Sequence, residues 1–298
     1  MKIARYWVRA EAENNAENNA EKNDEELFAW GWSDSSEAEA RGRAERSVAR
    51  IAAWRAAGCE TDAPDSWYGY DARPAREEIV EEFGTDGGGT TAVVTRNPYG
   101  VLVLNTRDLV FVDADIPHPP PSIGDLVPKF LRGLFGKPAA EAPPATPEEQ
   151  TLDKIRTWSA ENPQVGVRVY RTAAGFRLVV TSHAIEATAP EADGLLAALP
   201  TDTLYRQLCL SQECYRARLT PKPWRIGVPA PRQRYPWSSG EEEQAFRQWR
   251  SNYEKRAERF STCRFVEWLG PNDVLPELEP LIELHDRLTR CDADAPLA

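Results

Sequence analysis

The sequence predicts an α+β protein in which helices cover a mainly antiparallel sheet. Two observations lead to this class. Apolar or alternating segments of strand length occur in pairs joined by short turn sequences, as in β-hairpins. Between and after these pairs lie longer segments whose apolar residues recur at helical spacing. Because hairpins make antiparallel neighbours and helices must bury their apolar faces, we expect the helices to pack on the sheet.

The N-terminal part is expected to contain two strands and one helix. The strands fall at 2–9 and 27–32, on either side of a polar five-residue repeat that is interpreted as a solvated expansion. A helix over about 36–57 follows and has one apolar face. A hydroxyl within Ser33–Ser36 is expected to cap its start, and Gly58 is expected to end it.

The middle of the chain predicts three consecutive strands. Residues 92–96 and 101–105 flank the sequence Asn-Pro-Tyr-Gly at 97–100, which is a strong hairpin signal. Residues 109–112, Leu-Val-Phe-Val, are apolar on both faces. This strand is therefore expected in the centre of the sheet.

A proline-rich segment at 117–147 divides the chain. We expect an N-terminal α/β part at 1–116, this insertion or linker, and a C-terminal α+β part at 148–298 that packs on the same core. The C-terminal part predicts a hairpin of strands at 165–170 and 176–181. The other expected elements are helices at 147–160, 190–199, 201–214, 240–258 and 276–290, and a strand at 263–268.

The bulk composition narrows the class of protein. No stretch approaches the about 20 apolar residues of a membrane span, and the N-terminus lacks the apolar core of a secretion signal, so a cytoplasmic protein is expected. The five cysteines include no Cys-x-x-Cys pair, which argues against a zinc ribbon or a disulfide framework and favours buried thiols. The formal charge of −11 argues against non-specific binding of nucleic acid over the whole surface.

The strongest candidate site is a carboxylate pair at the end of the apolar strand. Asp113 and Asp115 stand at i and i+2, and alternation along a strand points both side chains to one face. Two carboxylates that close repel each other, and Mg²⁺ or Mn²⁺, which prefer oxygen ligands, would relieve the repulsion. In the alternative interpretation, Asp115 caps the turn at Pro117 and Asp113 pairs with an arginine.

Four later features are weaker candidates. The glycine-containing turn at 172–175 is expected to bring backbone donors, together with Arg177, to an anion. His183 follows the same hairpin and is a phosphate-binding candidate, although a lone histidine is more typical of a surface or a satisfied core position. Glu267 on a late strand is a candidate third metal ligand. The pair His285–Asp286 is only a weak indication of a metal phosphohydrolase.

Positive charge is concentrated in one segment of this acidic chain. Between residues 206 and 234 the only acid is Glu213, and the cationic residues are Arg206, Arg216, Arg218, Lys222, Arg225, Arg232 and Arg234. Guanidinium groups suit phosphate because they donate two parallel hydrogen bonds. The phosphate-binding candidates are Arg216, Arg218, Lys222 and Arg225. Alternatively, these cations neutralise carboxylates of the sheet, and Trp224 either stacks on a base or packs below the loop.

The order of these features resembles the archaeo-eukaryotic primase superfamily, which includes the primase-polymerases. In that family an apolar strand ends in Asp-x-Asp, a Ser-Gly-x-x-Gly-x-His-type turn and strand follow, and a later strand carries one more acid. Here Asp113-Ala-Asp115 is similar to the first motif. Residues 172–177 resemble a degenerate second motif, with Arg177 where the family has histidine, and Glu267 resembles the third. The resemblance implies an RRM-like or primase-like sheet.

The resemblance also implies a metal-dependent nucleotidyltransferase, or a derived relative that binds nucleotide or nucleic acid. In that role Asp113, Asp115 and Glu267 would hold Mg²⁺ or Mn²⁺, and Arg177 would contact phosphate. The expected ligands are a nucleoside triphosphate and single-stranded nucleic acid. A second hypothesis is a non-catalytic nucleic-acid-binding protein whose basic segment contacts backbone phosphates. A third is a structural or regulatory protein in which the basic segment and the acidic strand end pair with each other. The sequence leaves the oligomeric state open.

Overall fold

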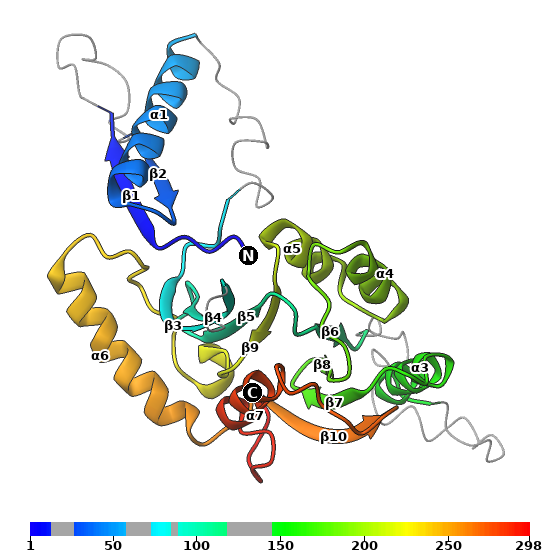
Figure 1. Cartoon of the computed structure of the whole chain (residues 1–298). Helices are drawn as coiled ribbons and strands as arrows, with labels where there is room; N and C mark the ends of the chain where they lie inside the picture. Colours follow the sequence, from blue (N-terminus) through cyan, green and yellow to red (C-terminus); the bar gives the residue numbers. More distant parts are fainter. Residues whose placement is uncertain (13–26, 58–72, 85–88, 118–144) are drawn as a thin grey trace, which may run out of the picture. The chain divides into compact units, whose positions relative to one another are not determined.

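The computed structural model describes residues 1–12, 27–57, 73–84, 89–117 and 145–298 (Figure 1). Over these residues helices accompany antiparallel sheets, which confirms the α+β class. The polar repeat and most of the proline-rich segment fall outside the described residues, as does Gly58. Within the described residues, no helix combines the length and the apolar character needed to cross a membrane.

The chain divides into two compact units. Unit 1 comprises Met1–Arg107 and Gln207–Glu258, and unit 2 comprises Asp108–Arg206 and Arg259–Ala298. The chain therefore crosses between the units three times, and the expected boundaries at 116 and 148 do not coincide with this division. One helix, α5 (Thr203–Gln212), contains the crossing at 206–207.

Unit 1 begins with a small α/β layer. Strands β1 (Tyr6–Glu11) and β2 (Phe28–Ser33) pair antiparallel, and α1 (Glu37–Ala56) packs against them. Ser36 Oγ accepts a hydrogen bond from the Glu39 amide at 3.2 Å, which confirms the predicted cap. A Cβ at Gly31 would lie 1.9 Å from the Ala40 carbonyl oxygen, so glycine allows the close approach of helix and strand.

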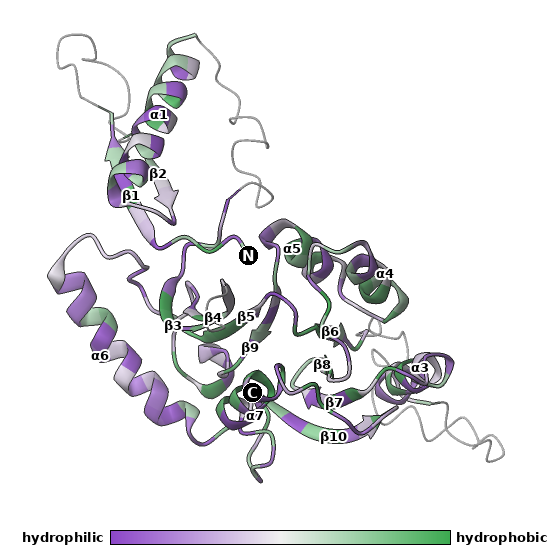
Figure 2. Cartoon of the chain, viewed as in Figure 1, coloured by the Kyte–Doolittle hydropathy of each residue, from purple (hydrophilic) through white to green (hydrophobic). Residues whose placement is uncertain are grey.

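The main sheet of unit 1 is an antiparallel meander completed by a later strand. Its order is β3-β4-β5-β9, and Figure 2 shows that β4 and β5 are largely hydrophobic whereas α6 is mostly hydrophilic. The expected hairpin around 97–100 is confirmed, with Gly100 at φ 79°. The elements are β3 (Glu78–Gly84), β4 (Thr90–Arg96), β5 (Leu102–Thr106), β9 (Tyr215–Arg218), η3 (Pro223–Ile226) and α6 (Gly240–Ala257).

An aromatic ladder on α6 holds the loop that follows β9. Phe246, Trp249 and Tyr253 stack in sequence, with ring centroids 5.6 and 5.1 Å apart. Tyr253 Oη donates to the Pro221 carbonyl oxygen at 2.6 Å, and Trp249 Nε1 donates to the Pro229 carbonyl oxygen at 2.8 Å. These bonds fix both ends of the basic loop to the helix.

Unit 2 is built on an antiparallel sheet of order β10-β7-β8-β6. The expected hairpin at 165–181 is confirmed as β7 and β8. The RRM-like strand order is not confirmed, because this hairpin occupies the centre of the sheet. The elements are β6 (Phe111–Asp115), α3 (Pro147–Glu161), β7 (Val167–Thr172), β8 (Gly175–Val180), α4 (Pro190–Ala198), β10 (Cys263–Leu269) and α7 (Glu279–Thr289).

The apolar strand expected in the centre of the sheet, β6, lies at an edge, so that prediction is wrong. Its outer side is covered by hydrogen bonds from the start of α5. The Asp202 amide donates to the Asp113 carbonyl oxygen at 3.2 Å, and Tyr205 Oη donates to the Phe111 carbonyl oxygen at 2.9 Å. Because the edge is covered and Phe111 and Val112 are both buried, the strand has the apolar sequence of a central one.

Candidate functional site

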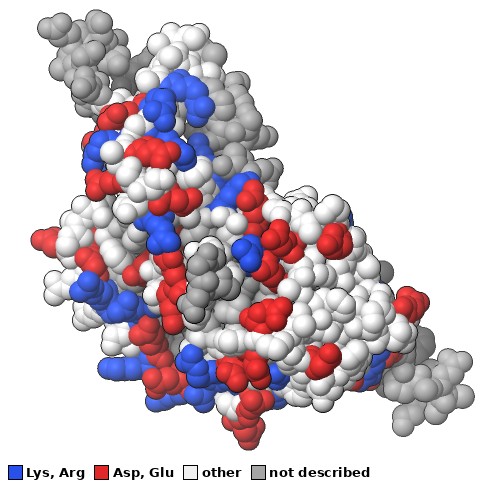
Figure 3. Space-filling view, viewed as in Figure 1, with Lys and Arg blue, Asp and Glu red and all other residues white. Residues whose placement is uncertain are grey.

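Net charge does not by itself locate a site on this protein. On the face that Figure 3 shows, positive and negative side chains are intermixed rather than gathered by sign. A candidate site must therefore be built from the partners of individual charged groups. The two units are described in turn.

In unit 2, Asp113 and Arg177 are direct cross-strand partners on β6 and β8. Arg177 Nε donates to Asp113 Oδ1 at 2.8 Å, and Nη2 donates to Oδ2 at 3.2 Å. This is a bidentate ion pair. The Arg177 side chain is 1% exposed and that of Asp113 is 35% exposed, so the pair connects the interior with the surface. The structure thus contains the arginine pairing that the sequence left open as the alternative to a metal.

The charge state of the pair is set by the neighbourhood of Arg177. Burial alone would lower the pKa of its guanidinium, but the charge of Asp113 and the hydrogen bonds to it raise that pKa above the ordinary value. The arginine therefore remains charged and neutralises Asp113. The repulsion between two carboxylates that motivated a metal site is already relieved in part by this cation.

A buried polar chain extends from Arg177 into α7. Arg177 Nη1 lies 3.4 Å from His285 Nε2, and His285 Nδ1 lies 2.9 Å from Asp286 Oδ1. Burial lowers the pKa of His285, so the ring is neutral near pH 7. Because an arginine can only donate, Nε2 is assigned as the acceptor and the ring proton is on Nδ1, where it donates to Asp286.

Asp286 ends this chain and is strongly held. Tyr170 Oη donates to its Oδ1 at 2.7 Å, and Arg168 Nη2 lies 2.8 Å from its Oδ2. Burial alone would raise the pKa of Asp286, but the hydrogen bonds from His285 and Tyr170 and the charge of Arg168 lower it overall. In the sequence, the only sign of this buried polar network is the adjacent pair of His285 and Asp286.

Asp115 lies where the carboxylate pair was expected. It is exposed at the end of β6, and its backbone is the partner of Gly175. Alternation on β6 puts its side chain on the same face as that of Asp113. The expected geometry of the two aspartates is therefore present, with one of them tied to Arg177.

Glu267 does not join the aspartates. It lies on β10, the edge strand opposite β6, so three strand spacings, about 14 Å, separate the two strands. Its register partner is Val169, whose neighbours across the sheet are Leu178 and Val112. Because Val112 alternates with Asp113, Glu267 points to the opposite face.

Glu267, the expected third metal ligand, forms an ion pair with an arginine on helix α3. Arg156 Nη2 on α3 lies 2.9 Å from Glu267 Oε1. Across the described residues, no group of three or more histidine, cysteine, aspartate or glutamate side chains is arranged to hold a metal ion. The three-carboxylate site implied by the resemblance does not fit this geometry, so we derive no step through a metal.

The glycine turn also differs from the expectation. The amides of Ala174 and Gly175, at 3.4 and 3.1 Å, donate to Thr172 Oγ1, so the turn uses these donors internally. A Cβ at Gly175 would lie 2.0 Å from the Ala114 carbonyl oxygen. Glycine is therefore required by the approach of β6. His183 is exposed, with Nδ1 2.7 Å from Ser182 Oγ, and it lies at the surface.

In unit 1, the basic segment divides into a structural and a surface part. Arg216 Nη2 donates to both oxygens of the buried Glu77 at 2.7 and 2.9 Å. Burial alone would lower the pKa of Arg216, but the charge of Glu77 and the hydrogen bond to it help to raise that pKa. This arginine neutralises a carboxylate, as the alternative interpretation held. Arg218, two residues along β9, is half-buried on the same face of the strand.

The surface part is formed by Lys222, Trp224 and Tyr99, which we call the aromatic–lysine surface. Lys222 Nζ lies 5.6 Å from the centroid of the Trp224 ring, within cation–π range. Trp224 and Tyr99 are 50% and 48% exposed, and their rings meet edge to face at 5.2 Å. Arg225 lies beside them in η3 and is half-buried. Trp224 therefore does not pack below the loop.

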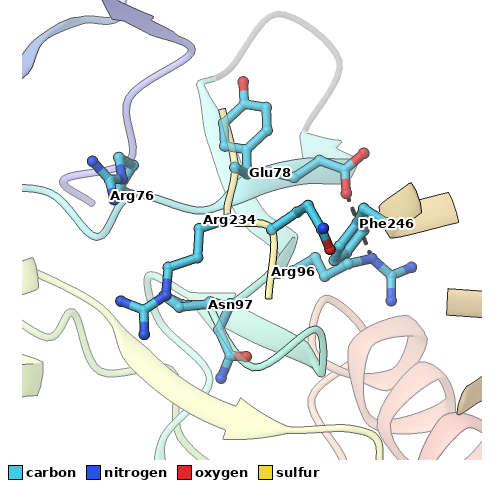
Figure 4. A pocket seen from close by; sticks show the side chains of 9 residues that line it. Arg76, Glu78, Arg96, Asn97, Arg234 and Phe246 are labelled. Atoms are coloured by element: carbon cyan, nitrogen blue, oxygen red, sulfur yellow. Dashed lines mark ion pairs between the residues drawn. The ribbon is translucent and has the colours of Figure 1, made fainter. Parts of the chain in front are cut away.

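Unit 1 also holds a pocket rich in arginine that the sequence did not predict, which we call the arginine pocket (Figure 4). Its charged lining residues are Arg76, Arg96, Arg234 and Glu78, and its other lining residues are Asn97, Pro98, Gln233, Tyr235 and Phe246. Figure 4 shows Arg96 turned toward Glu78, while Arg76 and Arg234 lie on the other side of the view. Sequence could have indicated only Arg234, through the basic segment.

Comparison with protein-family models, curated proteins and solved structures gave no match. The resemblance to primases therefore rests on the short motifs alone. Of the predicted site residues, the structure brings Asp113, Asp115 and Arg177 together. The phosphate-binding candidates Arg216, Arg218, Lys222 and Arg225 belong to the other unit.

Proposed function

We propose that this protein binds single-stranded nucleic acid without catalysis, through the aromatic–lysine surface. The observation that carries the proposal is the exposed contact of Tyr99 and Trp224 with Lys222 beside the tryptophan. Bases stack on exposed aromatic rings whatever their sequence, and a neighbouring cation attracts the backbone phosphates. We place this activity in the cytoplasm, because the four described cysteines are free and buried, as expected in a reducing compartment.

The rigid mounting of the surface supports this function. Asn97 Oδ1 accepts from the amides of Tyr99 and Val101 at 3.0 and 3.3 Å, which fixes the turn that carries Tyr99. The loop that carries Trp224 is anchored to α6 by the Tyr253 hydroxyl. Rings held in place lose little conformational entropy when a base stacks on them.

The net negative charge of the chain limits how many phosphates of a nucleic acid the protein is expected to contact. A formal charge of −11 repels a polyanion from most of the surface, so contact is confined to the few local cations. For single strands the slope of log affinity against log salt is about −0.7 per phosphate contacted. With Lys222 and Arg225 as the contacts, we expect a shallow slope of about −1.4.

The test is binding of fluorescent single-stranded DNA and RNA 12-mers, followed by anisotropy in EDTA. Trp224→Ala should weaken binding about 5- to 150-fold, since one stacked base contributes about 1–3 kcal/mol. The matched control is Phe28→Ala. Like Trp224, Phe28 is an exposed ring beside a cation: it is 45% exposed, and the Arg9 guanidinium lies 4.2 Å from its ring centroid. It lies on β2, outside the aromatic–lysine surface. Equal affinity of the Trp224 variant and the wild type would contradict the proposal.

A second candidate function is the metal-dependent nucleotidyl transfer implied by the primase resemblance. It is favoured by Asp113 and Asp115 sharing one face at an accessible strand end. It requires Asp113 to exchange Arg177 for Mg²⁺ or Mn²⁺. Titration of the wild type with a nucleoside triphosphate and Mn²⁺ separates the two functions. Binding that needs the metal and is lost in Asp113→Asn would favour transfer, and metal-independent binding of nucleic acid would favour the first proposal.

A further inference from the structure

The arginine pocket differs from the other basic features of unit 1 in how its charges are compensated. Arg96 is the buried arginine of the lining, and it is held by two carboxylates and a carbonyl group. Its Nε lies 3.5 Å from Glu78 Oε2, its Nη2 donates to Glu254 Oε1 at 3.3 Å, and its Nη1 donates to the Gly100 carbonyl oxygen at 2.9 Å. This arginine is structural.

Arg76 and Arg234 at the mouth are different. Within the described residues, neither forms an ion pair with a carboxylate. Arg76 instead lies over the Trp30 ring, with its guanidinium carbon 4.4 Å from the centroid. Burial, and then the positive charge of Arg234, lower the pKa of Arg76. Two arginines, the half-buried Arg76 and the exposed Arg234, therefore line one concavity, whose lining carboxylate, Glu78, is turned to Arg96.

An anion between the two guanidinium groups would relieve their mutual repulsion. The chain has 47 acidic and 36 basic residues, so acids to neutralise these arginines are plentiful elsewhere in the sequence. Asn97 and Gln233 add amide groups, which can donate hydrogen bonds, to the same lining. The enclosed space is only about 10 Å³, room for a single water. This space is too small for a phosphate group, so the accessible part of the pocket is its mouth beside the exposed Arg234.

We propose that the mouth of the arginine pocket, between Arg76 and Arg234, binds a phosphate dianion, either inorganic phosphate or the terminal group of a phosphate monoester. Two guanidinium groups match a dianion in charge and supply paired parallel donors to its oxygens. A phosphodiester carries a single charge, so the pocket favours a terminal phosphate over a backbone phosphate. This site is independent of nucleic-acid binding by the aromatic–lysine surface.

The test is isothermal titration of the full chain with inorganic phosphate, methyl phosphate and dimethyl phosphate at fixed ionic strength. Arg234→Met should weaken binding of the two dianions by at least about tenfold. The matched control is Arg232→Met, an exposed arginine two residues away that does not line the pocket. Tighter binding of methyl phosphate than of inorganic phosphate identifies a monoester as the ligand, and the reverse order identifies free phosphate.

A second measurement does not depend on the ligand. In chloride buffer, Arg234→Met should raise the melting temperature, because it removes the repulsion of Arg76, whereas Arg232→Met should leave it unchanged. Phosphate that binds wild type and Arg234→Met equally, or dimethyl phosphate that binds as tightly as the dianions, would overturn the proposal. Trp224→Ala should leave phosphate binding unchanged, so failure of this site and failure of nucleic-acid binding can be told apart.

Discussion

Replacement of Asp113 by asparagine tests whether this carboxylate is a partner of Arg177 or half of a metal site. The two interpretations predict opposite signs in the absence of metal. If Asp113 and Asp115 form an empty metal site, removing one charge relieves their repulsion and stabilises the fold. If Asp113 neutralises Arg177, the same change leaves a buried guanidinium without a full countercharge and destabilises the fold.

The magnitude follows from the exposure of the two partners. Breaking a fully buried ion pair from one side costs about 3–5 kcal/mol. Arg177 meets the condition of full burial, but about a third of the Asp113 side chain is in water, which screens the pair. We therefore expect Asp113→Asn to lower the free energy of unfolding by about 2–3 kcal/mol.

The assay is urea denaturation at pH 7 in EDTA, with coincident fluorescence and far-UV circular dichroism transitions required before a two-state fit. Asp115→Asn makes the same chemical change at an exposed position and should alter stability by less than about 0.5 kcal/mol. The double variant Asp113→Asn/Arg177→Met should be more stable than Asp113→Asn alone, because it removes the uncompensated charge. Stabilisation by Asp113→Asn in EDTA would refute the ion-pair reasoning.

Two further predictions concern unit 2. The pKa of the buried His285 is lowered from 6.5, so below about pH 6.5 the unfolded chain takes up a proton that the folded ring does not. The contribution of His285 to the free energy of unfolding should be complete above this pH and should fall by at most about 1.4 kcal/mol per pH unit below it. Melting curves measured from pH 7 to 5 should show this loss in the wild type and in the exposed control His183→Gln, and should not show it in His285→Gln. Gly175→Ala should destabilise by about 1–3 kcal/mol or more through its clash with β6, whereas Gly194→Ala, with nothing within 4 Å of the added methyl in α4, should stabilise the fold by up to about 1 kcal/mol in urea denaturation.

Local elements could be predicted because their signals are local. The hairpin around 97–100 and the capped helix at 37–56 depend on turn residues and caps within a few positions. The location of β6 could not be predicted the same way. An apolar sequence indicates that a strand is buried, but it does not indicate what buries it. Here the edge of β6 is covered by the start of α5 rather than by a neighbouring strand.

The part of the candidate site around Asp113 that could be predicted also depends on a local signal. The shared face of Asp113 and Asp115 follows from strand alternation, which is local. The partner of Asp113 depends on β6 pairing with β8, across 64 residues of sequence, and the exclusion of Glu267 depends on the order of all strands in the sheet. Neither is encoded in residue spacing. The motif match therefore grouped two aspartates that do share a face with a carboxylate, Glu267, that lies on the opposite face of the sheet.

The pairing of arginines offers a better guide to ligands in this acidic chain than their number. Arg177 and Arg216 were both phosphate candidates, and each proves to neutralise one carboxylate, Asp113 in unit 2 and Glu77 in unit 1. A guanidinium held in such a pair must break it before it can bind an external phosphate. Arg76 and Arg234 have no such pair to break within the described residues, so phosphate gains their full attraction. For the same reason, the basic groups of unit 1 are where an anionic ligand should be sought first.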